Sequence, residues 1–75
     1  MDQNYTAVIK QDGDWWIGWI EEVPGVNGQE RSKSALMESL KLALSEALEF
    51  NRAEARSAAG DHYSEERIAV PTTPA

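Results

Sequence analysis

Trp15-Trp16-Ile17-Gly18-Trp19-Ile20-Glu21 is the stretch of sequence that decides the fold, because its aromatic and β-branched residues are typical of a strand. A second β-prone run, Tyr5-Thr6-Ala7-Val8-Ile9-Lys10, precedes it, and Gln11-Asp12-Gly13-Asp14 separates the two. Asp-Gly between two β-prone runs is a strong hairpin signal, since glycine accepts a positive φ freely. The sequence therefore predicts that these two strands pair antiparallel.

Both faces of the second strand are apolar. Successive strand residues point to opposite sides, so Trp15, Ile17 and Trp19 share one face, while Trp16 and Ile20 share the other. A strand that is bulky on both faces needs cover on both, yet one helix covers only one side of a sheet. The tryptophans on the uncovered side should form an apolar patch of the kind that marks an interaction surface. Strand alternation alone leaves open which side that is.

A third strand and one long helix complete the expected architecture. Residues 22–28 form a turn-rich connection, and a short strand is expected near residues 26–30, at the end of that connection. A helix is expected from Ser32 or Ser34, either of which can serve as N-cap, to about Ala58. Its apolar stripe at helical spacing is Leu36, Leu40, Ala43, Leu44, Ala47 and Phe50. The sequence thus predicts a small antiparallel sheet with one helix packed on one face, an α+β fold.

The helix is too long for its sheet. Roughly 25 helical residues span about 37 Å, whereas a six-residue strand spans about 20 Å. Glu54 falls in the centre of the stripe, so contact with the core should end near Phe50 and the rest should overhang. Leu42 lies off the stripe, close to the charged face, and is a further candidate contact residue beside the tryptophans.

The C-terminal part of the chain is weakly patterned. Gly60 is a plausible end of the helix. Glu65-Glu66-Arg67-Ile68-Ala69-Val70 predicts a closing strand with Ile68 and Val70 on one face. Residues 1–70 are therefore expected to form one domain, with a frayed tail over residues 71–75.

Composition narrows the function classes. The net charge is −6, and the seven basic residues are scattered, which disfavours direct nucleic-acid binding and favours a basic protein partner. No cysteine is present, and no apolar run approaches the ~20 residues that span a bilayer, so a cytoplasmic protein without membrane contact is expected. A 75-residue domain buries only about 60% of the surface its unfolded chain exposes, so a second subunit should add stability.

The sequence contains no evident set of catalytic residues. The single histidine, His62, lies in a polar linker with no spacing typical of a metal site. Asp12 and Asp14 flank the turn glycine, where aspartate is favoured for local hydrogen bonding. No set of nucleophile, base and orienting group stands out, so we expect neither an enzyme nor a cofactor or metal site.

Four segments follow one another with short gaps. They are Tyr5-Thr6-Ala7-Val8-Ile9, Trp16-Ile17-Gly18-Trp19-Ile20, Val23-Pro24-Gly25-Val26, and a helix opened by Ser that reads Ala35-Leu36-Met37-Glu38-Ser39-Leu40-Lys41-Leu42-Ala43-Leu44. This order resembles the HicB-type antitoxin domain, with its Y-x-V-I first strand, L-P-G corner and helix of the form S/T-x-x-E-A-L. The resemblance covers about residues 5–50, and Glu65–Val70 is similar to the family's closing strand. The chain departs from the pattern at Val23, where the family prefers Leu, and at Ala35, where it prefers an acidic residue.

The resemblance implies a β-β-β-α-β domain, a partial RNase H-like fold without its catalytic carboxylates. Family members form dimers or larger oligomers and neutralise HicA-type toxins, which are small basic mRNA-cleaving proteins, by covering the toxin's active site. Many carry a further DNA-binding domain that represses their own operon. This chain ends at Ala75, where that domain would begin, so DNA contact is not carried over.

Three further functions stay open beside the antitoxin reading. One is an orphan structural domain that self-associates without a toxin partner. Another is a weak enzyme or ligand-binding domain built around His62. A third is a stacking platform for single-stranded nucleic acid, which lacks the basic groove it would need. The candidate residues for a partner or oligomer interface are Trp15, Trp16, Trp19 and Leu42.

Overall fold

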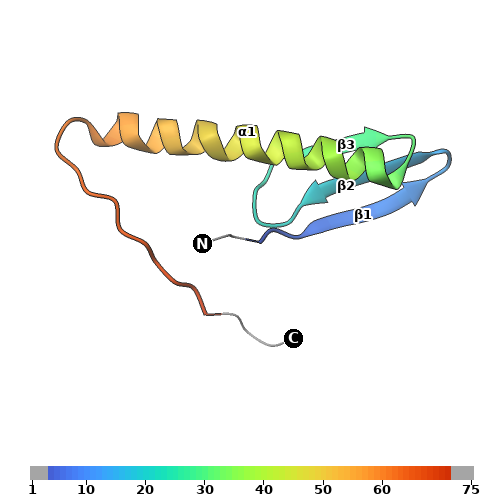
Figure 1. The fold of residues 1–75 in the computed structure, drawn as a ribbon, viewed down its shortest axis with the longest axis horizontal. Coiled ribbons are helices and arrows are strands. Elements are labelled where there is room, and N and C mark those ends of the chain that lie inside the picture. Colours follow the sequence, from blue (N-terminus) through green and yellow to red (C-terminus); the bar gives the residue numbers. More distant parts are fainter. Residues whose placement is uncertain (1–3, 72–75) are drawn as a thin grey trace.

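The sheet is a three-stranded antiparallel meander in the part of the chain that the computed structural model describes, residues 4–71. Its strands are β1 (Ala7–Asp12), β2 (Trp15–Ile20) and β3 (Asn27–Glu30), in the spatial order β1-β2-β3. The single helix α1 (Lys33–Ala59) packs over β2 and β3 on one face of the sheet (Figure 1). The predicted small α+β fold, with one long helix on an antiparallel sheet, is confirmed.

The hairpin between β1 and β2 forms where the Asp-Gly signal predicts it. Asp12 pairs with Trp15, which leaves Gly13 and Asp14 as a two-residue loop. Gly13 has a φ of 62°, a conformation that costs glycine little and most other residues more. β1 begins and ends two residues later than the predicted strand over residues 5–10.

The core is small and rests on a pair of glycines. Gly18 of β2 lies directly opposite Gly28 of β3. The missing side chains leave a flat spot, which Leu36 and Leu40 of α1 occupy as the two most deeply buried residues. The other buried apolar side chains are Ile20 and Val26.

Both ends of α1 carry the expected caps. Ser32, rather than Ser34, is the N-cap, and its hydroxyl oxygen accepts a hydrogen bond from the Ala35 N–H at 3.1 Å. Gly60 ends the helix with a φ of 83°, and its N–H donates to the Arg56 carbonyl oxygen at 3.3 Å.

The predicted overhang of the helix is confirmed, and it begins close to the expected place near Phe50. Every described residue from Glu49 onward is exposed, so the last eleven residues of α1, about 16 Å of helix, extend past the sheet. The expectation that Phe50 belongs to the core is wrong, because its side chain is 64% exposed. The apolar stripe continues along the helix after the strands beneath it have ended.

The predicted closing strand at residues 65–70 is also wrong. These residues form no strand, and they run as an extended, exposed arm that returns from the helix end (Figure 1). An ion pair between Arg56 and Glu65, 3.6 Å apart and exposed, links the arm to the overhang. Residues 65–70 are exposed and pair with no strand. Their alternating sequence pattern was therefore not sufficient to make them part of the sheet. Of the predicted frayed tail, residues 72–75 lie outside the described residues.

No helix within residues 4–71 has both the length and the hydropathy needed to cross a membrane.

We expect Gly18→Ala to lower the free energy of unfolding by about 1–3 kcal/mol, the usual cost of overpacking a core. A Cβ at position 18 would lie 2.9 Å from the Val8 carbonyl oxygen, a backbone atom of β1 that is fixed by strand pairing. Gly28→Ala is the matched control. Its closest contact would be the flexible Leu36 side chain at 3.2 Å, so the loss should be smaller. Urea denaturation measures both, and an equal or reversed order of losses would contradict this account of the core.

Candidate protein-binding face

The packing of α1 on the sheet determines which side of β2 is exposed. Gly18 and Ile20 are buried beneath α1, so the residues that alternate with them along the strand, Trp15, Ile17 and Trp19, point to the opposite side. Trp15 is 36% exposed and Trp19 is 42% exposed. Trp16 lies on the helix side and packs, half-buried, against the core. Two of the three predicted tryptophans therefore share an open surface, and Trp16 is not part of it.

Strand register defines the rest of this surface. Residues directly opposite one another in paired strands point to the same face. The outer sheet face accordingly consists of Val8, Lys10 and Asp12 on β1, Trp15, Ile17 and Trp19 on β2, and Asn27 and Gln29 on β3. Its apolar centre is a stripe along β2 that widens at Val8, which lies opposite Trp19. The helix contacts the other side of β2 and β3, which leaves the stripe without cover from α1.

Arg31 adds a feature that the sequence did not reveal. Its guanidinium lies over the ring of Trp15, with 4.2 Å between the Cζ atom and the ring centroid. A cation–π contact at an exposed site contributes about 0.5–1 kcal/mol. The stack orients the indole at one end of the stripe. Aromatic and basic residues were both visible in the sequence, but their contact depends on the β2–β3 register.

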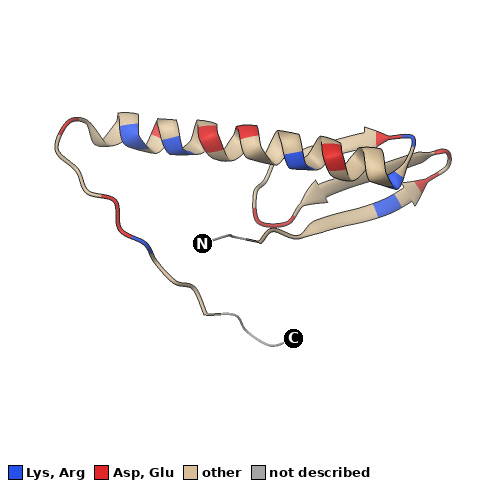
Figure 2. Cartoon of the chain, in the orientation of Figure 1, with Lys and Arg blue, Asp and Glu red and all other residues tan. Residues whose placement is uncertain are grey.

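Most acidic side chains lie around the outer sheet face, and few lie on it. Figure 2 shows acidic residues spread along α1, at both ends of the sheet and on the arm. Asp12 and Asp14 lie at the hairpin end of the stripe, and Glu21 and Glu22 follow β2 at its other end. The stripe of Trp15, Ile17 and Trp19 is therefore apolar in the middle and has carboxylates at both ends.

Glu22 is held in place by the backbone. Its Oε1 atom accepts a hydrogen bond from the Thr6 N–H at 2.8 Å, and this bond lowers the pKa of the Glu22 carboxyl. The Glu21 N–H donates to the Thr6 carbonyl oxygen at 2.9 Å. Both bonds tie the residue before β1 to the end of β2, so this acidic end of the stripe is ordered.

Leu42, the fourth predicted contact residue, lies elsewhere. Its side chain is 63% exposed. Leu42 follows the buried Leu40 by two residues, about 200° around the helix axis, and so faces away from the sheet. Leu42 and the outer sheet face lie on opposite sides of the molecule. A single flat partner surface cannot contact both.

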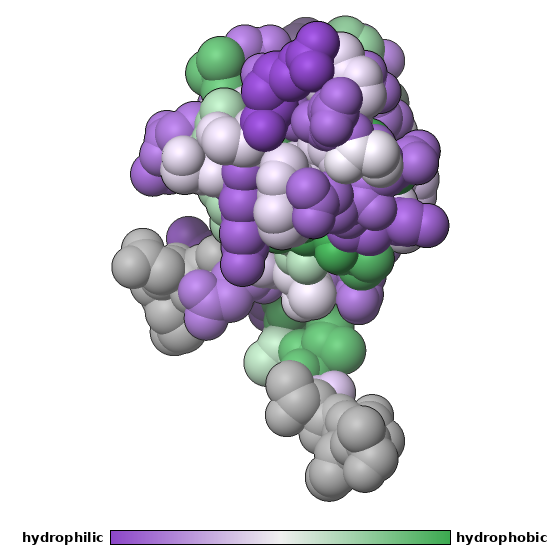
Figure 3. All heavy atoms as spheres, turned by 90° about the vertical axis from the view of Figure 1, so that its right-hand side faces the viewer, coloured by the Kyte–Doolittle hydropathy of each residue, from purple (hydrophilic) through white to green (hydrophobic). Residues whose placement is uncertain are grey.

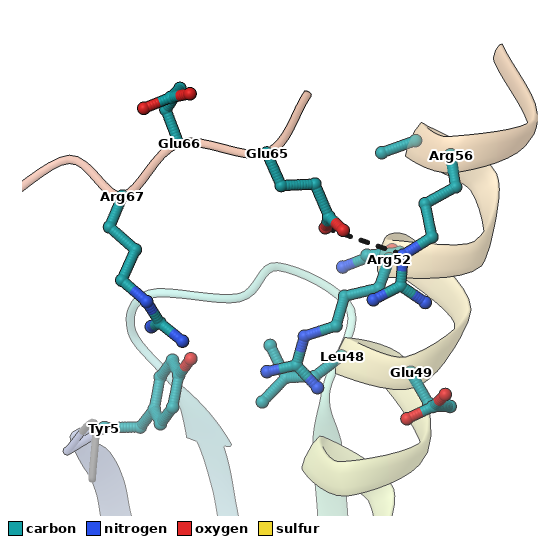
Figure 4. A pocket seen from close by; sticks show the side chains of 10 residues that line it. Tyr5, Leu48, Glu49, Arg52, Arg56, Glu65, Glu66 and Arg67 are labelled. Carbon is teal, nitrogen blue, oxygen red and sulfur yellow. Dashed lines mark ion pairs between the residues drawn. The ribbon is translucent and has the colours of Figure 1, made fainter. Parts of the chain in front are cut away.

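A second surface lies between the overhang of α1 and the arm. Figure 4 shows Arg52 and Arg67 reaching into this groove from its two walls, and the Arg56–Glu65 ion pair joins the arm to the helix. The groove also contains Glu49 and Glu66. Three of the seven basic residues thus gather here, contrary to their scatter along the sequence, but an equal number of carboxylates accompanies them.

The remaining candidate for chemistry, His62, is exposed in the connection after the helix. Within residues 4–71, no group of three or more His, Cys, Asp or Glu side chains is arranged to hold a metal ion.

Comparison of the chain with models of protein families, with curated proteins and with solved structures gave no match.

The two sides of β2 should differ in tryptophan fluorescence. We expect the variant that keeps only Trp19, Trp15→Phe with Trp16→Phe, to emit at longer wavelength and to be quenched more by acrylamide. The variant that keeps only Trp16, Trp15→Phe with Trp19→Phe, should be the more protected, because Trp16 packs against the core. Equal quenching of the two variants in the folded monomer would show that the sides are assigned wrongly.

Proposed function

We propose that this chain is a cytoplasmic protein-binding module of the antitoxin type, which neutralises a small basic, HicA-like mRNA-cleaving toxin by covering its active site. The observation that carries the proposal is the outer sheet face, an apolar stripe of Trp15, Ile17 and Trp19 without cover from α1. Exposed apolar patches of this kind mark interaction sites, and tryptophan is enriched among the residues that dominate interface energies.

The charge of the chain supports a basic partner. A protein that cleaves RNA binds a polyanion, and its active site is correspondingly cationic. The carboxylates at both ends of the stripe, Asp12 and Asp14 at one and Glu21 and Glu22 at the other, suit such a surface. Electrostatic complementarity of this type raises the rate of encounter, while the apolar stripe supplies most of the affinity.

The resemblance of residues 5–50 to the HicB-type antitoxin domain supports the same proposal. It supplies the class of partner, and the exposed stripe supplies a surface for the contact. The resemblance includes Trp16 and Trp19 in one segment. These two side chains serve different purposes in the proposal, because Trp16 supports the core and Trp19 contacts the partner.

An orphan domain that only self-associates is the second candidate function. The observation that favours it is the small core, in which the buried apolar side chains among the described residues are Ile20, Val26, Leu36 and Leu40. A domain with so little buried apolar surface gains stability from a second copy.

The decisive experiment mixes the purified chain with the product of a neighbouring gene that encodes a small basic protein. We expect a complex and suppression of RNA cleavage. Trp15→Ala and Trp19→Ala should each weaken the complex at least about 30-fold, the effect of removing a residue that dominates an interface. Calorimetry or surface plasmon resonance measures the affinity.

Leu42→Ala is the matched control, since it removes an exposed apolar side chain from the opposite side of the molecule. We expect it to leave the affinity unchanged. A complex that is sensitive to Leu42→Ala and insensitive to both tryptophan substitutions would place the interface on the helix and refute the proposed surface. Failure to bind or to suppress cleavage would remove the antitoxin function and leave the self-associating domain.

A further inference from the structure

The arm after the helix, residues 61–71, exposes apolar side chains that have no evident use in a single copy. Ile68 is 85% exposed and Val70 is 79% exposed. They are two residues apart in an extended segment, so they point to the same side. Figure 3 shows hydrophobic residues, in green, projecting below the body of the molecule, where the arm extends. A solvent-exposed strand pattern of this kind is suited to pairing with a free sheet edge.

The free edge that matches it is that of β1. Within residues 4–71, β1 pairs with β2 on one side and with no strand on the other. The Glu21 N–H bonds to the Thr6 carbonyl oxygen, and antiparallel bonding recurs at every second residue. The backbone groups of Ala7, Ile9 and Gln11 therefore point to the free edge, ready to pair with an added strand.

An apolar groove of about 480 Å³ lies beside the Ala7 end of this edge. It exists because α1 packs over β2 and β3 and leaves the helix side of β1 partly open. Its apolar lining comes from both layers: Tyr5, Ala7 and Ile20 from the sheet side, and Met37, Leu40 and Leu44 from α1. A strand added at this end of β1 would turn alternate side chains toward the groove, and Ile68 and Val70 have that spacing.

We propose that two copies of the chain exchange their arms, so that residues 65–70 of each copy pair with the free edge of β1 in the other and place Ile68 and Val70 in its groove. The exchange uses the edge of the sheet and leaves the outer sheet face, with Trp15 and Trp19, available to another partner. The inference is therefore independent of the proposed toxin binding.

The uncovered end of α1 favours exchange over closure of the arm on its own sheet. Closing the arm on its own copy would leave the overhang uncovered, including Phe50, which continues the stripe of Leu36 and Leu40. A second copy supplies a body to cover it.

Sedimentation velocity of the complete chain tests the exchange. We expect a dimer at micromolar concentration, and Ile68→Asp with Val70→Asp should raise its dissociation constant at least about 100-fold. Circular dichroism should show that this variant keeps its helix, because the arm contributes nothing to the core. Trp15→Ala with Trp19→Ala is the control and should leave the dimer intact. Two results would overturn the proposal. One is a chain that is still monomeric at a protein concentration of about 100 µM, where even a weak dimer should form. The other is a dimer that depends on the tryptophans and not on the arm.

Engineered disulfides distinguish exchange from closure within one copy. The chain has no cysteine, so two introduced thiols have no competitor. Lys10→Cys in one copy and Ala69→Cys in another place the thiols on the same side of the paired strands, away from the groove. Val8→Cys is the alternative partner, one strand period away. We expect the mixture of the two single variants to form a disulfide-linked dimer on oxidation. Disulfides that form only within the double variant, as a monomer, would show that each arm closes on its own sheet.

Discussion

The contact of Leu36 and Leu40 with the facing glycines 18 and 28 is the constraint on which the rest of the structure depends. Two positions without side chains, opposite each other on neighbouring strands, leave room for both leucines against the sheet, because a Cβ at either position would lie within 3.2 Å of a leucine carbon. Because Gly18 lies on the helix side, alternation along β2 sends Trp16 and Ile20 to the same side and the bulkier pair, Trp15 and Trp19, to the other. The exposed aromatic surface is thus a consequence of where one glycine lies.

Local signals in the sequence were sufficient for the elements themselves. The Asp12-Gly13 turn, a serine cap at residue 32 or 34, the helical stripe and the stop at Gly60 each involve residues close together in the chain. Each is found in the structure, with Ser32 as the cap. The failures have a common cause. Phe50 follows the helical period, and Ile68 and Val70 follow the strand period, yet all three are exposed. Periodicity describes which side chains face together, and burial also needs a partner surface at that place.

The candidate binding face was likewise predictable only in part, because its residues are local in sequence and its exposure depends on the packing of other elements. The sequence identified the tryptophans of β2 and the need for cover on both sides. It did not decide between the two sides, because that choice depends on the pairing of Gly18 with Gly28, ten residues away on another strand. The stacking of Arg31 on Trp15 also depends on this register. The separation of Leu42 from the tryptophans follows from the packing of α1, which only the assembled layers reveal.

The meander order β1-β2-β3 has a consequence for how the molecule forms. Each strand pairs with its neighbour in the chain, and the helix that completes the core follows directly, so the contacts are local and the folding is expected to be fast. The arm comes after these elements and is absent from the core. Folding of the sheet and helix is therefore a first-order process that each chain completes alone, while any pairing of arms between chains is second-order. The amount of protein present, rather than the sequence, then determines how much of it is assembled.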